Sequence, residues 1–161
     1  MTDDMVFDKE KGELRFLGQR QAAVDAQSLC DHLDSLVGIV VAEVIMNNLE
    51  TRLGKKDGMR VREMNPKATV DELVQQLAKV DLVTGMGLTK VSLPKDPSLP
   101  TIVEICNPIV KGSRGASKSF LFSWWAGALS SILDSELEAR TVNYDEQQNT
   151  MRCEIVRRKT S

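Results

Sequence analysis

The stretch FLFSWWAGALSSIL, residues 120–133, decides the fold of this chain. Four of the seven aromatic residues of the chain fall within its first six positions. On a helix, Phe122 and Trp125 share one face and Trp124 and Ala128 share another, so the segment is apolar nearly all round. A helix of this kind is buried on several sides. We therefore predict a central helix over this stretch, ending near residue 134.

Strands are expected on both sides of this helix. The predicted strands are Leu88–Leu93, Thr101–Ile109 and the two arms of a closing hairpin at 137–144 and 150–158, around the turn DEQQN. In the last arm, Met151, Cys153 and Ile155 alternate with polar residues, as in a strand with one buried face. Helical patterns dominate the part before residue 86. This order favours an α+β fold, in which N-terminal helices pack on an antiparallel sheet and one aromatic-rich helix is inserted between strands.

Apolar residues at helical spacing begin at Ala26 and continue until about Gly54. They form either one long helix or two helices joined near Gly38, because a glycine inside a helix costs about 1 kcal/mol relative to alanine. The stretch GIVVAEVI is apolar on more than one face, which suits a helix that is buried on several sides or shared with a second subunit. We therefore predict a homodimer, and its interface residues are Leu36, Val40, Val44 and Ile45.

The remaining segments complete one domain of 161 residues. Thr69 and Glu72 have the spacing of a capping box, which predicts a helix from Val70 to about Val83. Residues 1–18 form an N-terminal hairpin or arm, in which MVFD and ELRFL surround the turn KEKG. Residues 19–85 form the helical part, and residues 86–161 form the sheet, the aromatic helix and the closing hairpin.

Composition excludes several classes of protein. The formal charge is −2, and no window approaches the ~18 to 20 apolar residues of a membrane span. The acidic N-terminus does not resemble a signal peptide, so we expect a cytoplasmic protein. The basic stretch 51–70 lacks aromatic residues and is interpreted as a solvated loop rather than a nucleic-acid site. Three distant cysteines and a single histidine, His32, form neither a disulfide framework nor a zinc motif.

Catalytic motifs are scarce. The segment GSRGASKS, residues 112–119, resembles a phosphate-binding loop, but Ser117 stands where that loop needs its second glycine. We interpret it as a linker near a helix N-terminus, with at most an unspecific anion site. Cys30 and His32 are two positions apart and point to different faces of a helix. We therefore expect no enzyme, no catalytic residues and no cofactor.

The aromatic helix has two interpretations, ordinary core packing or the wall of an apolar ligand pocket. Bulky aromatic residues supply rigid walls, Gly127 beside small residues leaves room, and flexible methionines adapt the walls to a ligand. On the second interpretation the ligand lies between this helix and the sheet. The candidate ligand-binding residues are Phe120, Phe122, Trp124, Trp125, Gly127, Ala128, Leu129, Met46, Met86 and Cys106.

The segment from Met86 to Arg157 resembles the 4-vinyl reductase domain, whose members are also called hydrocarbon-binding proteins. The motifs that carry the resemblance are GMGLTKVSL, TIVEICNP, FLFSWWAGALSSIL and MRCEIV. The resemblance implies an α+β domain, usually homodimeric, that holds a small hydrophobic or lipid-like molecule between helices and sheet. Sensor members bind zinc on the closing hairpin, but here only Cys153 fits, and Val142 and Asp145 stand at the other two positions. We expect no metal.

Three kinds of function stay open from the sequence. The first is a stand-alone module that binds a small hydrophobic ligand, with a sensing or regulatory role and a possible protein partner. The second is a scaffold or tethering subunit, since the resemblance extends to the core subunits of the TRAPP vesicle-tethering complexes. The third is an enzyme such as a pigment-vinyl reductase, which would need a hydride-carrier site that the sequence lacks.

Overall fold

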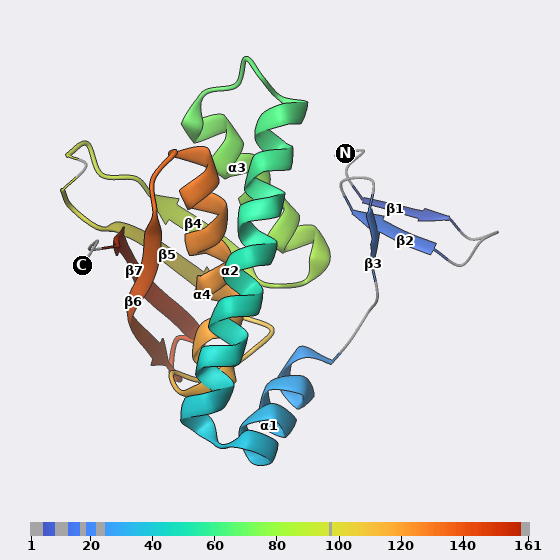
Figure 1. Cartoon of the computed structure of the whole chain (residues 1–161), viewed down its shortest axis with the longest axis vertical. Coiled ribbons are helices and arrows are strands. Elements are labelled where there is room, and N and C mark those ends of the chain that lie inside the picture. Colours follow the sequence, from blue (N-terminus) through green and yellow to red (C-terminus); the bar gives the residue numbers. More distant parts are fainter. Residues whose placement is uncertain (1–4, 9–12, 17–18, 22–24, 97, 159–161) are drawn as a thin grey trace.

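The structure is a computed structural model that describes residues 5–8, 13–16, 19–21, 25–96 and 98–158 (Figure 1). Its elements, in chain order, are β1 (Met5–Asp8), β2 (Glu13–Phe16), β3 (Gln19–Gln21), α1 (Ala26–Val37), α2 (Ile39–Met64), α3 (Val70–Thr84), β4 (Leu88–Ser92), β5 (Thr101–Cys106), α4 (Gly115–Ile132), β6 (Leu137–Asp145) and β7 (Thr150–Arg157).

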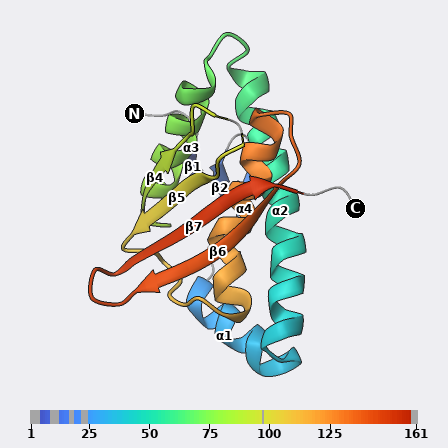
Figure 2. The same cartoon turned by 90° about the vertical axis from the view of Figure 1, so that its left-hand side faces the viewer.

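The main sheet has the strand order β4-β5-β7-β6, and every neighbouring pair is antiparallel. Helices gather on one face of this sheet, with α4 behind the middle strands (Figure 2). Along β5, the side chains of Thr101, Val103 and Ile105 are buried while the alternate residues are partly exposed. Because α4 lies between β5 and β6 in the chain, the predicted α+β fold with an inserted aromatic helix is confirmed.

The main core forms where α4 meets the sheet. Phe122, Trp125 and Leu129 have no exposed surface, and they pack in one cluster with Ile105 and Met151 of the sheet. Helix α3 adds Leu73 and Leu77 to the same cluster. Each fully buried large apolar side chain contributes roughly 1.5 to 3 kcal/mol to the free energy of unfolding. The segment chosen from sequence is therefore the central element of the core.

Helices α2 and α4 approach each other through glycines. A Cβ atom at Gly54 or Gly58 would clash with the backbone of Trp124 or Ala128 on α4. A Cβ atom at Gly127 would in turn lie 2.9 Å from the Lys55 nitrogen of α2. Glycine, which lacks a Cβ atom, is the residue that allows two backbones to come this close. The buried residues of α2 accordingly recur every three or four positions, and both of its glycines are among them.

Several predicted boundaries were wrong. Helix α2 does not end near Gly54 but continues to Met64, so most of the basic stretch 51–70 is helical and not a loop. Its glycines, which the sequence suggested as a helix end, are contact points with α4. Helix α4 begins at Gly115 within the expected linker. Strand β5 ends at Cys106, because Asn107 has a left-handed φ of 53° and Pro108 follows.

Other boundaries were predicted correctly. The long helical region is divided at Gly38, whose φ is 82°. The capping box of α3 is present, with the Thr69 nitrogen donating to the Glu72 carboxylate at 2.7 Å. Strands β1 and β2 form the expected antiparallel hairpin, whose turn at 9–12 lies outside the described residues. A third strand, β3, falls in the region expected to be helical and pairs with β2.

Candidate functional site

The most unusual group in the main core is the carboxyl of Asp81, which is only 4% exposed. It continues the inner row of α3, one helical turn after Leu77. The Trp125 indole nitrogen donates a hydrogen bond to Asp81 Oδ2 at 2.8 Å, and the Thr89 hydroxyl donates to the same oxygen at 2.5 Å. Three elements, α3, α4 and β4, therefore meet at one carboxylate oxygen inside the apolar core.

Burial changes the acidity of Asp81. Loss of hydration raises its pKa to about 6, and the hydrogen bonds from Thr89 and Trp125 oppose the rise. A carboxyl group with this pKa exchanges its proton near pH 6 rather than near pH 4. Perturbed acids of this kind in apolar surroundings are frequent in functional sites. Asp81 is thus the first candidate for a polar anchor within the core.

The neighbouring Trp124 forms a second contact of the same type. Its indole nitrogen donates to the carboxylate of Asp57 on α2 at 3.0 Å. Burial raises the pKa of Asp57, and burial together with the charge of Asp57 raises the pKa of Glu50 to about 7. The rings of Trp124 and Trp125 meet edge to face, 5.3 Å apart. The two adjacent indoles therefore bind carboxylates on two different helices.

The candidate ligand-binding residues do not lie around one space. Phe122, Trp125, Ala128 and Leu129 belong to the main core, and Met86 packs against it. Met46 belongs to a second cluster between α1, α2 and the start of α4, and Phe120 contacts both clusters. Cys106 is partly exposed at the end of β5, where the Thr150 hydroxyl lies 3.7 Å from its sulfur.

The room expected beside Gly127 is filled. Its Cα faces the backbone of Thr51 and Lys55 on α2, not the sheet. Trp124, too, points toward α2 through its bond to Asp57. Gly127 therefore allows the two helices to pack closely. The sequence interpretation, which placed a pocket wall at this residue, is corrected.

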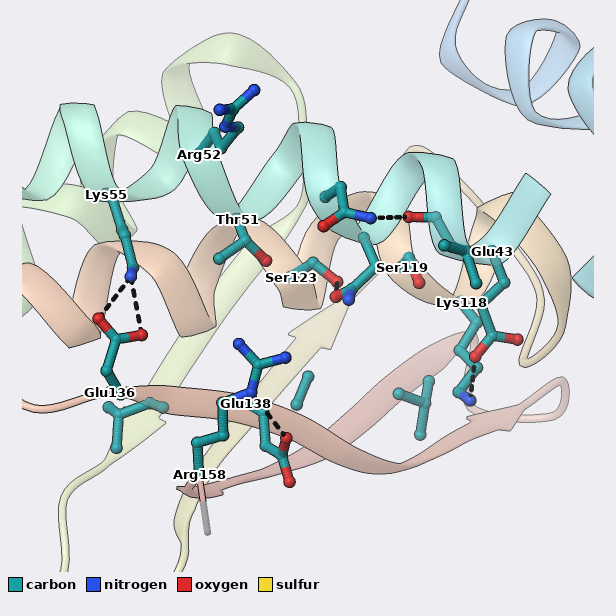
Figure 3. A pocket seen from close by; sticks show the side chains of 16 residues that line it. Glu43, Thr51, Arg52, Lys55, Lys118, Ser119, Ser123, Glu136, Glu138 and Arg158 are labelled. Carbon is teal, nitrogen blue, oxygen red and sulfur yellow. Dashed lines mark hydrogen bonds and ion pairs between the residues drawn. The ribbon is translucent and has the colours of Figure 1, made fainter. Parts of the chain in front are cut away.

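An open pocket of about 290 Å³ lies elsewhere, between α2, the outer side of α4 and strand β6 (Figure 3). None of the ten candidate residues lines it. Charged and hydroxyl side chains predominate in its wall, with a smaller apolar part formed by Val44, Leu137, Ala139 and Val142. The sequence interpretation missed this pocket, because its residues come from segments far apart in the chain.

The start of α4 carries its own anion. The Ala116 backbone nitrogen donates to the Asp34 carboxylate of α1 at 2.8 Å. Carboxylates are favourable at this position because the first N–H groups of a helix lack backbone partners. The unspecific anion site considered for residues 112–119 is therefore occupied by a side chain of the protein itself.

The four predicted interface residues form part of an exposed apolar strip. The exposed fractions are 69% for Leu36, 76% for Val40, 55% for Val44 and 42% for Ile45. Val41 and Leu49 extend the strip, at 49% and 48%. Large apolar side chains gathered in this way are typical of interaction surfaces. Nothing in the structure of the single chain shows what covers them.

Cysteine chemistry and metal binding are limited. Burial raises the pKa of Cys30 to about 11 and that of Cys153 to about 12, which keeps both as thiols. Cys30 is buried whereas His32 is exposed, so they do not form a pair. Within the described ranges, no group of three or more His, Cys, Asp or Glu side chains could hold a metal ion. No helix among those residues is long and apolar enough to cross a membrane.

The sequence interpretation missed Asp81, Asp57 and Glu50. A signal for Asp81 was present, since an acidic residue that continues the apolar row of Leu73 and Leu77 interrupts the buried face of an amphipathic helix. No comparable signal exists for the other two acids. Their burial depends on the close approach of α4, which only the folded structure reveals.

No family model matches the chain, and no curated protein matches it. Solved structures do. The chain is similar to the phenol-responsive sensory domain of the transcription activator PoxR, solved with phenol, at a TM-score of 0.76 and 10% identity over 96% of this chain and 85% of that one. A second match is a vinyl-4-reductase family protein from Methanocaldococcus jannaschii, at a TM-score of 0.48 and 17% identity over 74% of this chain and 78% of that one. The expected α+β fold is therefore confirmed, and it is the fold that this chain shares with the PoxR sensory domain.

Proposed function

We propose that the chain is a stand-alone binding module for a small, mainly apolar molecule, with a sensing or regulatory role. The observation that carries the proposal is the buried carboxyl of Asp81 in the apolar core between α3, α4 and the sheet. Ligand sites typically combine apolar walls with a few polar groups that fix the orientation of the ligand. The fold of a domain that was solved with phenol supports the same function.

The donors around Asp81 suggest the chemistry of the ligand. Trp125 and Thr89 both donate to one carboxylate oxygen, so a ligand hydroxyl that donates to the same carboxylate could replace one of them. Trp125 has no exposed surface, and a ligand must therefore move side chains of the core to enter. We expect an aromatic alcohol or a longer apolar chain, such as a fatty acyl or isoprenoid group, with at most one polar end.

A titration with phenol and with 1-octanol tests the proposal, using tryptophan fluorescence as the readout because the Trp125 indole donates to Asp81. The wild-type protein should give a saturable change, and toluene, which lacks the hydroxyl, should bind more weakly than phenol. Replacing a hydrogen-bonded carboxylate by an amide in Asp81→Asn should weaken phenol binding roughly tenfold. The matched control is Asp71→Asn, an exposed acid in the first turn of the same helix.

If neither alcohol gives a saturable change with the folded wild-type protein, the binding proposal fails. The scaffold or tethering function would then be the better explanation of the exposed strip on α1 and α2. If Asp81→Asn binds phenol more weakly, its affinity is compared with that of Thr89→Val, which keeps the Asp81 carboxylate and removes only the Thr89 hydroxyl that donates to it. Equal phenol affinity in both variants and in the wild type would exclude Asp81 as the anchor.

The proposal is one of binding and not of chemistry. Cys30 is buried and its pKa is raised, so it is not an activated nucleophile. We expect the module to work in the cytoplasm, where three unpaired cysteines remain reduced. It would pass its signal to another protein.

We also propose that the module is a homodimer. The support is the exposed strip around Val40 and Val44, which an isolated subunit would leave in contact with water. Leu36 and Ile45 extend the strip along α1 and α2. A tethering subunit would use the same strip to bind a different chain, so the mass of the assembly separates the two readings.

A further inference from the structure

The open pocket of about 290 Å³ is separate from the buried carboxyl of Asp81. Helix α2 forms one wall, the edge strand β6 forms the other, and the outer side of α4 forms the floor (Figure 3). Ser119 and Ser123 line it from the side of α4 that faces away from Trp125. A water molecule occupies about 30 Å³ of liquid, so the space suits an organic molecule of roughly ten non-hydrogen atoms.

Each carboxylate in the wall already has a cationic partner. Glu136 accepts two hydrogen bonds from Lys55 Nζ, at 2.6 and 2.8 Å, and closes one end of the pocket. Glu43 accepts from Lys118 Nζ at 2.5 Å and closes the other end. These hydrogen bonds hold Lys55 and Lys118 at the two ends of the pocket. The acidic groups of the wall are therefore neutralised where they stand.

Among the cations of the wall whose ion pairs lie in the described part of the chain, Arg158 has the longest pair. Glu138 makes its short ion pair with Arg140, whereas Arg158 Nε lies 3.8 Å from the other oxygen of Glu138. A backbone hydrogen bond from the Arg158 nitrogen to the Glu136 carbonyl, at 2.9 Å, fixes the position of the residue at the pocket. In Figure 3 the Arg158 guanidinium points into the space between β6 and α2, while Arg52 points away from it.

The rest of the wall complements a guanidinium. The side chain of Thr51 points into the space opposite Arg158, together with the hydroxyl groups of the two serines (Figure 3). Ser123 donates to the Asn47 side-chain oxygen at 2.7 Å, which orients that amide at the floor. Hydroxyl and guanidinium groups in one concave site suit an anionic oxygen group, and the apolar part of the wall suits a short hydrocarbon body.

We propose that this pocket binds a small organic anion, with its carboxylate or phosphate on Arg158 and the hydroxyl groups of Thr51 and Ser119, and its apolar body against Ala139 and Val142. This site is additional to the apolar site beside Asp81. The two ligands would contact opposite sides of α4. Neither site depends on the other for its contacts, so each can be tested separately.

The test is an NMR titration of the ¹⁵N-labelled full chain with three probes that share one apolar body: hexanoate, hexyl phosphate and 1-hexanol. We expect hexanoate, hexyl phosphate or both to shift the amide signals of Thr51 and Ala139, which line the pocket from α2 and β6, and 1-hexanol to leave these two signals unchanged. The Arg158→Gln variant should bind the anion roughly tenfold more weakly or worse. The matched control, Arg157→Gln, removes an exposed arginine outside the pocket and should bind like the wild type.

The probes also identify the source of the anion chemistry. Stronger binding of hexanoate indicates a free carboxylic acid, and stronger binding of hexyl phosphate indicates a phosphate ester. The proposal is overturned if no anion shifts these signals at about 10 mM, if 1-hexanol shifts them equally, or if Arg158→Gln binds as well as the wild type. Phenol serves as the independent probe of the Asp81 site, so failure of one proposal leaves a distinct pattern from failure of the other.

Discussion

The substitution Gly127→Ala should destabilise the fold through the contact between α2 and α4. The new Cβ atom would lie 2.9 Å from the Lys55 nitrogen, 3.0 Å from the Thr51 carbonyl carbon and nearer still to the Thr51 carbonyl oxygen. Unstrained contacts of a carbon atom lie at about 3.5 to 4.0 Å. The two backbones would therefore have to separate by on the order of 1 Å, since neither neighbour is the end of a flexible side chain.

The size of the effect follows from two opposing contributions. Alanine gains about 1 kcal/mol over glycine inside a helix. Overpacking against a neighbour typically costs about 1 to 3 kcal/mol, and more where backbone must move. Separation of the helices would also stretch the hydrogen bond from Ser131 Oγ to the Lys55 carbonyl, now 2.9 Å long. Because backbone must move here, the cost lies at the upper end of that range, and we expect a net loss of roughly 1 to 2 kcal/mol in the free energy of unfolding.

Urea unfolding followed by tryptophan fluorescence measures this loss directly. The control is Glu63→Ala, an exposed position on α2, which should change the free energy of unfolding by less than about 0.5 kcal/mol. Gly54→Ala should behave like Gly127→Ala, because its Cβ would meet the backbone of Trp124. A Gly127→Ala protein as stable as the wild type, or more stable, would refute the close crossing of the two helices.

Four further results are expected. Val40→Glu should convert a wild-type dimer into monomers in analytical ultracentrifugation, and a wild-type protein that sediments as a monomer would contradict the proposed interface. Because the pKa of Asp81 is raised from 3.8 to about 6, the folded state binds its proton more tightly than the unfolded state. The free energy of unfolding should therefore fall by on the order of 2 to 3 kcal/mol from about pH 4 to about pH 6. Urea titrations at several pH values measure this decrease, and Asp81→Asn should remove it. Cys30 and Cys153 should resist a thiol reagent at pH 8 in the native protein and react after unfolding, and rapid native labelling of either, identified by mass spectrometry, would show that it is not buried. Elemental analysis after dialysis should find far less than one zinc ion per chain, since Val142 and Asp145 stand where zinc-binding relatives are expected to carry ligands, and stoichiometric zinc would contradict this.

The sequence predicted the elements of this fold whose information is local. Thr69 and Glu72 identify the start of α3 because a capping box needs only residues three positions apart. The aromatic helix was also predictable, since a helix that is apolar all round has no place except the centre of a domain. Its start was missed by five residues, because Gly115 begins the helix with a cap that comes from the distant Asp34.

The end of α2 could not be predicted in this way. A glycine in a sequence indicates either the end of a helix or a place where another backbone comes close, and the pattern of a single helix does not distinguish these. Gly54 and Gly58 belong to the second kind only because Trp124 and Ala128 lie opposite them. The same reasoning explains Gly127, which suggested an opening for a ligand and instead faces α2. The open pocket could not be predicted either, because Lys55, Glu136 and Arg158 come from segments of the chain that only folding brings together.

The two tryptophans give α4 a second role beyond filling the core. Trp125 holds the carboxyl of Asp81 on α3, Trp124 holds that of Asp57 on α2, and the two rings touch edge to face. If a ligand hydroxyl displaced the Trp125 N–H from Asp81, the Trp125 ring would have to turn. The centroid of the Trp124 ring lies 5.3 Å from that of Trp125, so the Trp124 ring would have to adjust as well. Asp57 is on the helix that also carries Val40, about 25 Å further along, so α2 connects the buried site with the surface where we expect a partner. Removing the Trp124 N–H in Trp124→Phe should interrupt that connection while leaving the bonds to Asp81 in place, so ligand binding would persist without its effect on assembly.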